Sequence, residues 1–316
     1  MTTPIIRCVK QQLEAELHYV TASKYSSLLE GNIHLDKLHL CDSDWTEIKD
    51  ELKAENFNLV IDLHKVTKSL RLGSFLNKPI IQFNKASLAK WLVLKFNINR
   101  LPKGHLIDRF FEGVADIKVT NDGKGLELFI DEHSEHKMLN FLDRLEINGA
   151  YTALVIGGAQ WTKQIPIELC VDYINHSEEP IVLIGGPEEV DKAKQIVEFS
   201  NRHINNFVGQ YTLLESAVLM RESKLVITGD TGMMHIAAVY SKPTIVMYGS
   251  TSPIFGMYPY TVGDDSQIKY LLPDHLSCWP CSKSGRSKCP KEHAKCLYDW
   301  KAFDLLTQIN KLDIRN

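Results

Sequence analysis

A short polar turn, Gly229-Asp230-Thr231-Gly232, follows an apolar run and precedes a segment with helical spacing. The first backbone N–H groups of a helix have no partner within the helix, and with the helix dipole they attract anions. Asp230 or Thr231 can cap this helix, Gly232 lets a ligand approach the backbone, and His235 lies one turn further on. The turn predicts an anion-binding site, although an ordinary strand–helix turn with an Asp or Thr cap is the simpler alternative.

Three other predicted strand–helix turns carry glycine or capping residues: Gly157-Gly158, Gly185-Gly186, and Gly209 with Thr212. In a parallel sheet such turns share the carboxyl edge, where ligands bind. Lys163, close to the first turn, can contact a phosphate as a point charge. No G-x-G-x-x-G with a following acidic residue and no Walker A loop is present, which disfavours hydride transfer and P-loop hydrolysis. The four turns together predict a ligand that contains a diphosphate.

The elements that must position these turns alternate between strand and helix along the chain, which indicates parallel α/β structure. We expect two domains, residues 1–147 and 148–316, joined by a polar break at 146–150. In the first domain the pattern predicts helices at 3–13, 23–31, 45–56, 67–76, 86–97, 105–114 and 133–145 and strands at 16–21, 35–41, 57–62, 79–83 and 126–130. In the second it predicts strands at 151–156, 181–184, 207–209, 223–228 and 243–247 and a final helix at 299–311.

Length and composition fit this organisation, because 316 residues with 44% hydrophobic and 24% charged residues suffice for two domains with separate cores. No apolar run reaches the roughly 18 residues that a membrane-spanning helix needs. The start lacks the basic and apolar regions of a signal peptide. We therefore expect a cytoplasmic protein.

The segment from Lys65 to Arg109 contains ten Lys or Arg residues and one acidic residue, Asp108. A basic face of this extent suggests an anionic partner, such as a phosphorylated lipid, a sugar acid or a nucleic acid. Within it, the predicted helix 86–97 places apolar residues between Lys90 and Lys95. That helix could rest on an anionic membrane, or belong to the core with its lysines extended to solvent.

Four cysteines gather near the C-terminus with the spacing C-x2-C-x7-C-x6-C: Cys278, Cys281, Cys289 and Cys296. In a reducing cytoplasm such a cluster suggests a structural zinc ion more than disulfides. His275 and His293 are spare candidate ligands. The alternative is a set of packed thiols that brace a loop before the final helix.

The segment 229–238 with 248–253 closely resembles the signature of bacterial glycosyltransferase family 9, the ADP-heptose:lipopolysaccharide heptosyltransferases. Lys163 with Pro166 resembles the Lys-x-x-Pro step of that family, and residues 61–69 and 105–110 resemble its first-domain segments more loosely. The resemblance implies the GT-B fold, in which two Rossmann-like, doubly wound parallel-sheet domains face each other across a cleft.

In that family the second domain binds the nucleotide-sugar donor and the first binds the acceptor. Carried over, the donor ADP-heptose would contact Lys163, Asp230, Thr231, Gly232 and His235, with the turn of Glu188 and Glu189 near the adenosine. The basic region, with Lys65, Lys68, Arg71 and Arg109, would face an anionic lipopolysaccharide precursor at the inner membrane. The resemblance thus implies a protein peripheral to that membrane and no nucleic-acid partner.

Transfer in the family inverts the sugar configuration and needs no metal, so a carboxylate should deprotonate the acceptor hydroxyl. Family members open with a strand and a Gly-Asp-Val type loop that carries this carboxylate, and we expect that strand and loop to be missing before Thr2. Asp62, at another strand end, is a weak substitute, and a turn or cap role is the simpler reading. The alternatives are a nucleotide-sugar binding protein without efficient turnover and a GT-B enzyme with another donor, such as a UDP-linked hexose.

Overall fold

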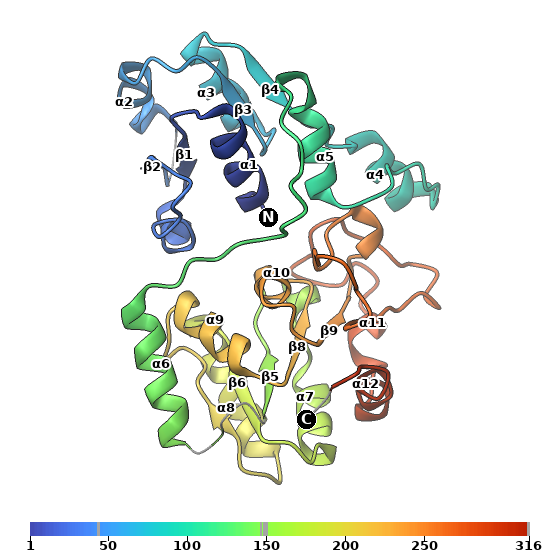
Figure 1. The fold of residues 1–316 in the computed structure, drawn as a ribbon. Coiled ribbons are helices and arrows are strands. Elements are labelled where there is room, and N and C mark those ends of the chain that lie inside the picture. Colours follow the sequence, from blue (N-terminus) through green and yellow to red (C-terminus); the bar gives the residue numbers. More distant parts are fainter. Residues whose placement is uncertain (43–44, 146, 148–150, 315–316) are drawn as a thin grey trace. The chain divides into compact units, whose positions relative to one another are not determined.

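The computed structural model describes residues 1–42, 45–145, 147 and 151–314 (Figure 1). The chain forms two compact units. The first contains Met1–Ser87 and Pro102–Phe129, and the second contains Leu88–Leu101 and Ile130–Asn316.

The second unit is built on a six-stranded, entirely parallel sheet. Its strands lie in the order β10 (Ile268–Leu271), β9 (Thr244–Met247), β8 (Leu225–Gly229), β5 (Thr152–Val155), β6 (Ile181–Ile184) and β7 (Asn205–Asn206). Four of them are buried along their whole length, as the continuous apolar runs predict for a parallel sheet covered on both faces. The predicted strands 151–156, 181–184, 223–228 and 243–247 are confirmed to within two residues.

Helices cover both faces of this sheet. On one face, alternate strand residues such as Leu183 and Ile227 pack with α7 (Ile167–His176), α8 (Val190–Phe199) and α12 (Ala302–Ile309). On the other face, Val246 packs with Met234 of α10 (Gly232–Val239). The remaining helices of the unit are α4 (Ser87–Phe96), α6 (Glu132–Arg144), α9 (Leu213–Glu222) and the short α11 (Lys295–Tyr298). The unit is therefore doubly wound.

Helix α6 belongs with the second unit, although its sequence lies before the expected boundary at 147. It packs on α9 through two ion pairs, Lys137–Glu215 at 2.5 Å and Glu135–Arg221 at 2.9 Å. The predicted break at 146–150 lies outside the described residues except for residue 147.

The first unit contains two separate pairs of parallel strands among its described residues. The pairs are β1 (His18–Thr21) with β2 (Lys37–Leu40), and β3 (Val60–Asp62) with β4 (Ile80–Gln82). Its helices are α1 (Thr3–Leu13), α2 (Lys49–Ala54), α3 (Thr67–Leu76) and α5 (Leu106–Gly113). The helices predicted at 3–13 and 67–76 are confirmed residue for residue.

Two predicted strands were wrong. Residues 126–130 are extended without strand pairing, because Glu127 turns to α1: its backbone N–H donates to the Thr3 hydroxyl and its carboxylate pairs with Arg7 at 3.0 Å. Residues 207–209 form the turn after β7, which is Asn205–Asn206. The Asn206 side chain accepts from the backbone N–H of Val208, and Gly209 has φ +74°, so the chain leaves the sheet there.

Candidate functional site

The turn after β8 places Asp230 and Thr231 ahead of α10, as the sequence predicts. Asp230 does not cap the helix: its carboxylate pairs with the ammonium of Lys163, with Nζ and Oδ2 3.1 Å apart. Thr231 stands at the N-cap position but makes no side-chain capping bond to the helix. Since neither side chain caps the first turn, its N–H groups remain available to a ligand.

The space in front of this helix end is open on the side of Gly232, where a Cβ would meet no heavy atom within 4 Å. Asp230 is buried and the Lys163 side chain is 18% exposed. His235 lies one turn into α10 and is half-buried. The structure thus gathers Lys163, Asp230, Thr231 and Gly232 at the carboxyl edge of the sheet, with His235 on the helix behind them.

Close backbone contacts hold the loop that carries Lys163. A Cβ on Gly229 would overlap the carbonyl oxygen of Lys163, and a Cβ on Gly249 would overlap that of Thr162. The Thr162 hydroxyl lies 2.7 Å from that of Ser250 and accepts from the backbone N–H of Arg286 at 2.7 Å. Glycine at the ends of β8 and after β9 is therefore required for the loop to reach this edge.

Glu189 connects the first two glycine turns. Its carboxylate accepts from the backbone N–H of Gly186 at 2.9 Å and, more weakly, from that of Gly158 at 3.4 Å. Glu189 is buried, whereas Glu188 beside it is exposed. The two glutamates therefore differ: Glu189 organises the turns, and Glu188 is open to a ligand.

Two residues that the sequence did not single out support this edge. The Gln164 amide donates to the carbonyl of Gly158 at 2.8 Å. The Lys192 ammonium donates to the carbonyl of Ile156 at 2.9 Å, and burial lowers the pKa of this lysine. A lysine on an amphipathic helix and a glutamine in a loop carry no sequence signal for such a role, because both depend on where the chain folds back.

Asp62 lies at the end of β3 and its carboxylate is surrounded by donors. It accepts from the backbone N–H groups of His64 and Lys65 at 3.0 and 2.7 Å, from the Ser69 hydroxyl at 3.0 Å and from the Gln82 amide at 3.2 Å. A general base needs an oxygen that can approach the acceptor hydroxyl. The geometry therefore supports the simpler reading of Asp62 as the residue that organises this turn.

The basic residues of the first unit are not equivalent. Lys68 and Arg71 on α3 are exposed, while the Lys65 ammonium folds back onto the carbonyl of Phe83 at 3.1 Å. Arg109 is only 2% exposed inside the packing of α5, and burial lowers its pKa. Arg109 therefore does not contribute to a basic surface, because the amphipathic α5 turns it inward.

The four cysteines Cys278, Cys281, Cys289 and Cys296 are free thiols, and among the described residues no three of them form a group whose sulfur atoms all lie within 4.8 Å of one another. Burial and the neighbouring thiols Cys281, Cys289 and Cys278 raise the pKa of Cys296 to about 12. The sulfur of Cys278 lies 3.7 Å from Nε2 of His293, one of the two predicted spare ligands. The cysteine-rich segment 278–296 also contacts the loop that carries Lys163, since the backbone N–H of Arg286 donates to the Thr162 hydroxyl.

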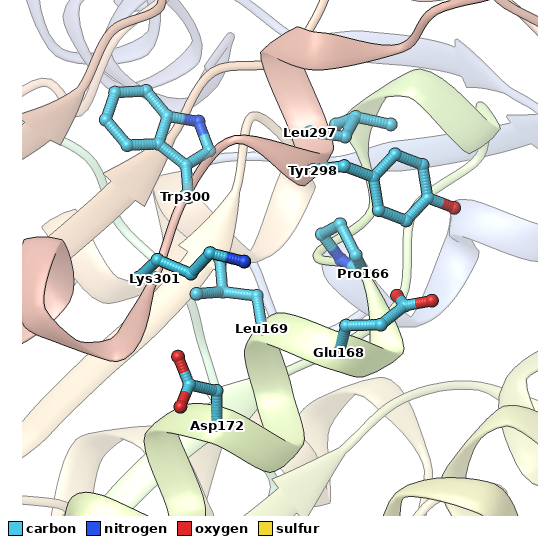
Figure 2. A pocket seen from close by; sticks show the side chains of 8 residues that line it. All are labelled: Pro166, Glu168, Leu169, Asp172, Leu297, Tyr298, Trp300 and Lys301. Atoms are coloured by element: carbon cyan, nitrogen blue, oxygen red, sulfur yellow. The ribbon is translucent and has the colours of Figure 1, made fainter.

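A small polar cavity of about 180 Å³ lies beside the start of α7, separate from the predicted donor residues (Figure 2). Glu168 and Asp172 of α7 form one side of it, and Tyr298, Trp300 and Lys301 form the other. The Asp172 carboxylate already accepts from the backbone N–H of Ala302 at 2.7 Å. This cavity therefore marks the junction of α7 with the C-terminal helices rather than the site at the sheet edge.

Within the described residues, no helix combines the length and the apolar character that crossing a bilayer requires.

Comparisons with known proteins agree with this geometry. Residues 45–289 match the family model for glycosyltransferase family 9 (heptosyltransferase). The lipooligosaccharide heptosyltransferase 2 of Campylobacter jejuni is 28% identical over 144 residues, which are 44% of this chain and 43% of that protein. This match spans less than half of the relative's length.

Two solved structures share the fold over 98% of this chain. They are the glycosyl transferase family 9 protein of Veillonella parvula (TM-score 0.76, 21% identity, 92% of that chain) and the Escherichia coli heptosyltransferase WaaC with ADP (TM-score 0.63, 18% identity, 94% of that chain). The predicted GT-B fold is confirmed. Because the family model covers well over half of the sequence, the chain belongs to glycosyltransferase family 9.

Proposed function

We propose that this protein is an inverting glycosyltransferase that moves a heptose from ADP-heptose to an anionic lipopolysaccharide precursor. The observation that supports this most is the Lys163–Asp230 pair at the uncapped start of α10, next to open space at Gly232. The family membership and the names of the relatives, which are heptosyltransferases and include one solved with ADP, support the choice of donor.

In the proposed complex the donor diphosphate lies against the first turn of α10. Free N–H groups and the helix dipole attract its negative charge there, and the Lys163 ammonium adds a full positive charge. Asp230 holds that ammonium in position and can also accept from sugar hydroxyls, while Glu188 lies on the turn assigned to the adenosine. When the sugar leaves, the same groups stabilise the charge that develops on the diphosphate, so this step requires no metal ion.

The acceptor side of the proposal rests on charge and on an exposed apolar surface. Lys68 and Arg71 are exposed cations of the first unit. On α4, Leu88 and Phe96 are 70% and 60% exposed, and Trp91 packs its ring against Phe96, while Lys90 and Val93 face inward. The exposed apolar side chains of α4 suit contact with a membrane surface, and we infer that the protein works at the cytoplasmic side of the inner membrane.

The four-cysteine cluster is proposed to hold a structural zinc ion near the donor edge. Thiols must lose their protons to bind a metal, so loading should release protons. Metal analysis of the purified protein, with Cys281→Ser and Cys289→Ser beside Cys8→Ser, tests this. Unchanged metal content in the first two variants would show that the thiols only pack together.

Donor binding is tested by calorimetry with ADP, UDP and GDP and with their sugars. We expect ADP-heptose to bind best, and Lys163→Met and Asp230→Ala to weaken binding at least tenfold, because each removes one partner of a largely buried charge pair. Lys194→Met is the control, since its partner Asp191 forms an exposed pair on α8. Tighter binding of UDP sugars would favour a different donor.

Turnover is measured separately, as ADP released from ADP-heptose in the presence of acceptor. Release that depends on acceptor and disappears in Asp230→Ala supports the full proposal. Binding without any release would identify a nucleotide-sugar binding protein instead.

A further inference from the structure

Two histidines of the first unit face each other across the parallel strands β1 and β2. The strand register pairs His18 with Lys37 and Val20 with His39, so both imidazoles project from the same face. His39 is completely buried and the His18 side chain is 6% exposed. One nitrogen of each ring and one oxygen of Glu55, the C-cap residue that follows α2, lie within 4.8 Å of one another.

Each imidazole also has a carboxylate at its outer nitrogen. Nδ1 of His39 lies 2.6 Å from Glu51 of α2, and Nε2 of His18 lies 3.2 Å from Glu16. The two inner nitrogens, Nδ1 of His18 and Nε2 of His39, are 3.0 Å apart. The chain of contacts is therefore carboxylate, imidazole, imidazole, carboxylate.

The protons of these three contacts do not balance when both imidazoles are neutral. Three contacts need three protons, but two neutral imidazoles carry only one N–H each. If those two N–H groups point to Glu16 and Glu51, the inner nitrogens turn two lone pairs toward each other. A positive charge between the inner nitrogens, carried either by one added proton or by a metal ion, removes this conflict.

We propose that His18, His39 and Glu55 bind a zinc ion at this position. Zinc takes imidazole and carboxylate ligands in a tetrahedral set, and a water molecule would complete it. Glu16 and Glu51 then accept from the outer N–H groups, the arrangement that fixes the orientation of metal-bound histidines. The Glu55 carboxylate can serve both the metal and Lys37, which lies 2.5 Å from one of its oxygens.

The two inner nitrogens are already close to the separation that zinc requires. Zinc–nitrogen bonds of about 2.0–2.1 Å at tetrahedral angles place two nitrogens about 3.3 Å apart, so the rings need to separate by only a few tenths of an ångström. The Phe57 ring packs edge-on against His18 and provides an apolar wall. The ion would join α2 to the β1–β2 pair, and its binding would stabilise the first unit.

The experiment is a zinc titration of the full chain, stripped of metal and monitored by a competing chromophoric chelator. We expect the His18→Gln variant to bind one zinc ion fewer than the unmodified protein. Glu55→Gln should weaken the affinity for that zinc ion at least tenfold, because mutation of residues that only hydrogen-bond to zinc ligands already lowers metal affinity by about tenfold or more. Glu55 is half-buried at a helix end, so its variant tests the site even if a histidine variant does not fold.

Cobalt distinguishes this site from the cysteine cluster. Cobalt bound by imidazole and carboxylate lacks the intense thiolate charge-transfer absorption, so His18→Gln should lose a cobalt equivalent without reducing that absorption. His203→Gln, at an exposed position, and Lys37→Met, which removes a charge but no ligand, should keep the full stoichiometry. The proposal would be overturned if His18→Gln and Glu55→Gln both bound as much zinc as the unmodified protein. It would also be overturned if the unmodified protein bound no zinc beyond the zinc held by the cysteine thiols.

Discussion

The carbonyl oxygen of Lys163 occupies the space in which a Cβ of residue 229 would lie. The loop after β5 therefore sits directly on the end of β8, and Lys163 can reach Asp230 only because residue 229 is glycine. The segment that resembles the family signature begins at this glycine, and the contact gives a physical reason for a glycine there.

Gly229→Ala should destabilise the second unit by about 3 kcal/mol or more and abolish ADP binding, because the Lys163 loop must move away from β8. Thermal unfolding and calorimetry measure the two effects. Gly232→Ala is the stability control, since its Cβ enters open space and should leave the unfolding temperature nearly unchanged. Equal stability of the two variants would contradict the proposed contact.

Glu189→Gln should lower the free energy of unfolding by about 1–3 kcal/mol, because an amide cannot accept from the N–H groups of both Gly158 and Gly186 as a carboxylate does. ADP binding should also weaken, because the turns at Gly158 and Gly186 are no longer held by one carboxylate. Glu188→Gln carries the same chemical change at an exposed position and should not alter stability. Chemical denaturation of the three proteins provides the comparison.

Asp122 should contribute to the acid sensitivity of the protein. The Arg7 guanidinium, 2.7 Å away, lowers the pKa of this carboxyl from 3.8 to about 2. A depressed pKa in the folded state means that the stabilisation is present above about pH 4 and is lost as the pH falls toward 2. Asp122→Asn should therefore lower the free energy of unfolding at neutral pH. Between about pH 4 and pH 2, the variant should lose less stability than the unmodified protein does. Asp191→Asn changes an exposed carboxylate and should leave the dependence of stability on pH unchanged.

The exposed face of α4 should bind membranes. Leu88→Ser with Phe96→Ser should weaken binding to vesicles of anionic phospholipid by about tenfold or more, because each buried apolar side chain contributes about 1.5–3 kcal/mol. Phe303→Ser is the matched control, since Phe303 is 76% exposed on α12. Vesicle sedimentation measures the difference. If the variant with Leu88→Ser and Phe96→Ser binds the vesicles as well as the Phe303→Ser variant and the unmodified protein do, or if the unmodified protein does not bind, α4 is not a membrane contact.

The sequence by itself determined most of the second unit. Its buried parallel strands read as continuous apolar runs, and the turns after them carry glycine and capping residues, so the edge with Asp230, Thr231 and Gly232 could be located from local pattern alone. Thr212 was expected as a cap, and it does accept from the backbone N–H of Glu215 at the start of α9.

Only the tertiary structure decided how those residues are used. Asp230 pairs with Lys163 rather than capping α10, Glu189 binds backbone N–H groups of two turns, and Arg109 is buried in α5. The assembly of His18, His39 and Glu55 likewise depends on the register of β1 and β2. The physical reason is the same throughout: helix and strand periodicity is a local property of the chain, whereas the partner of a charged side chain is set by segments that are distant in sequence and meet only when the chain folds.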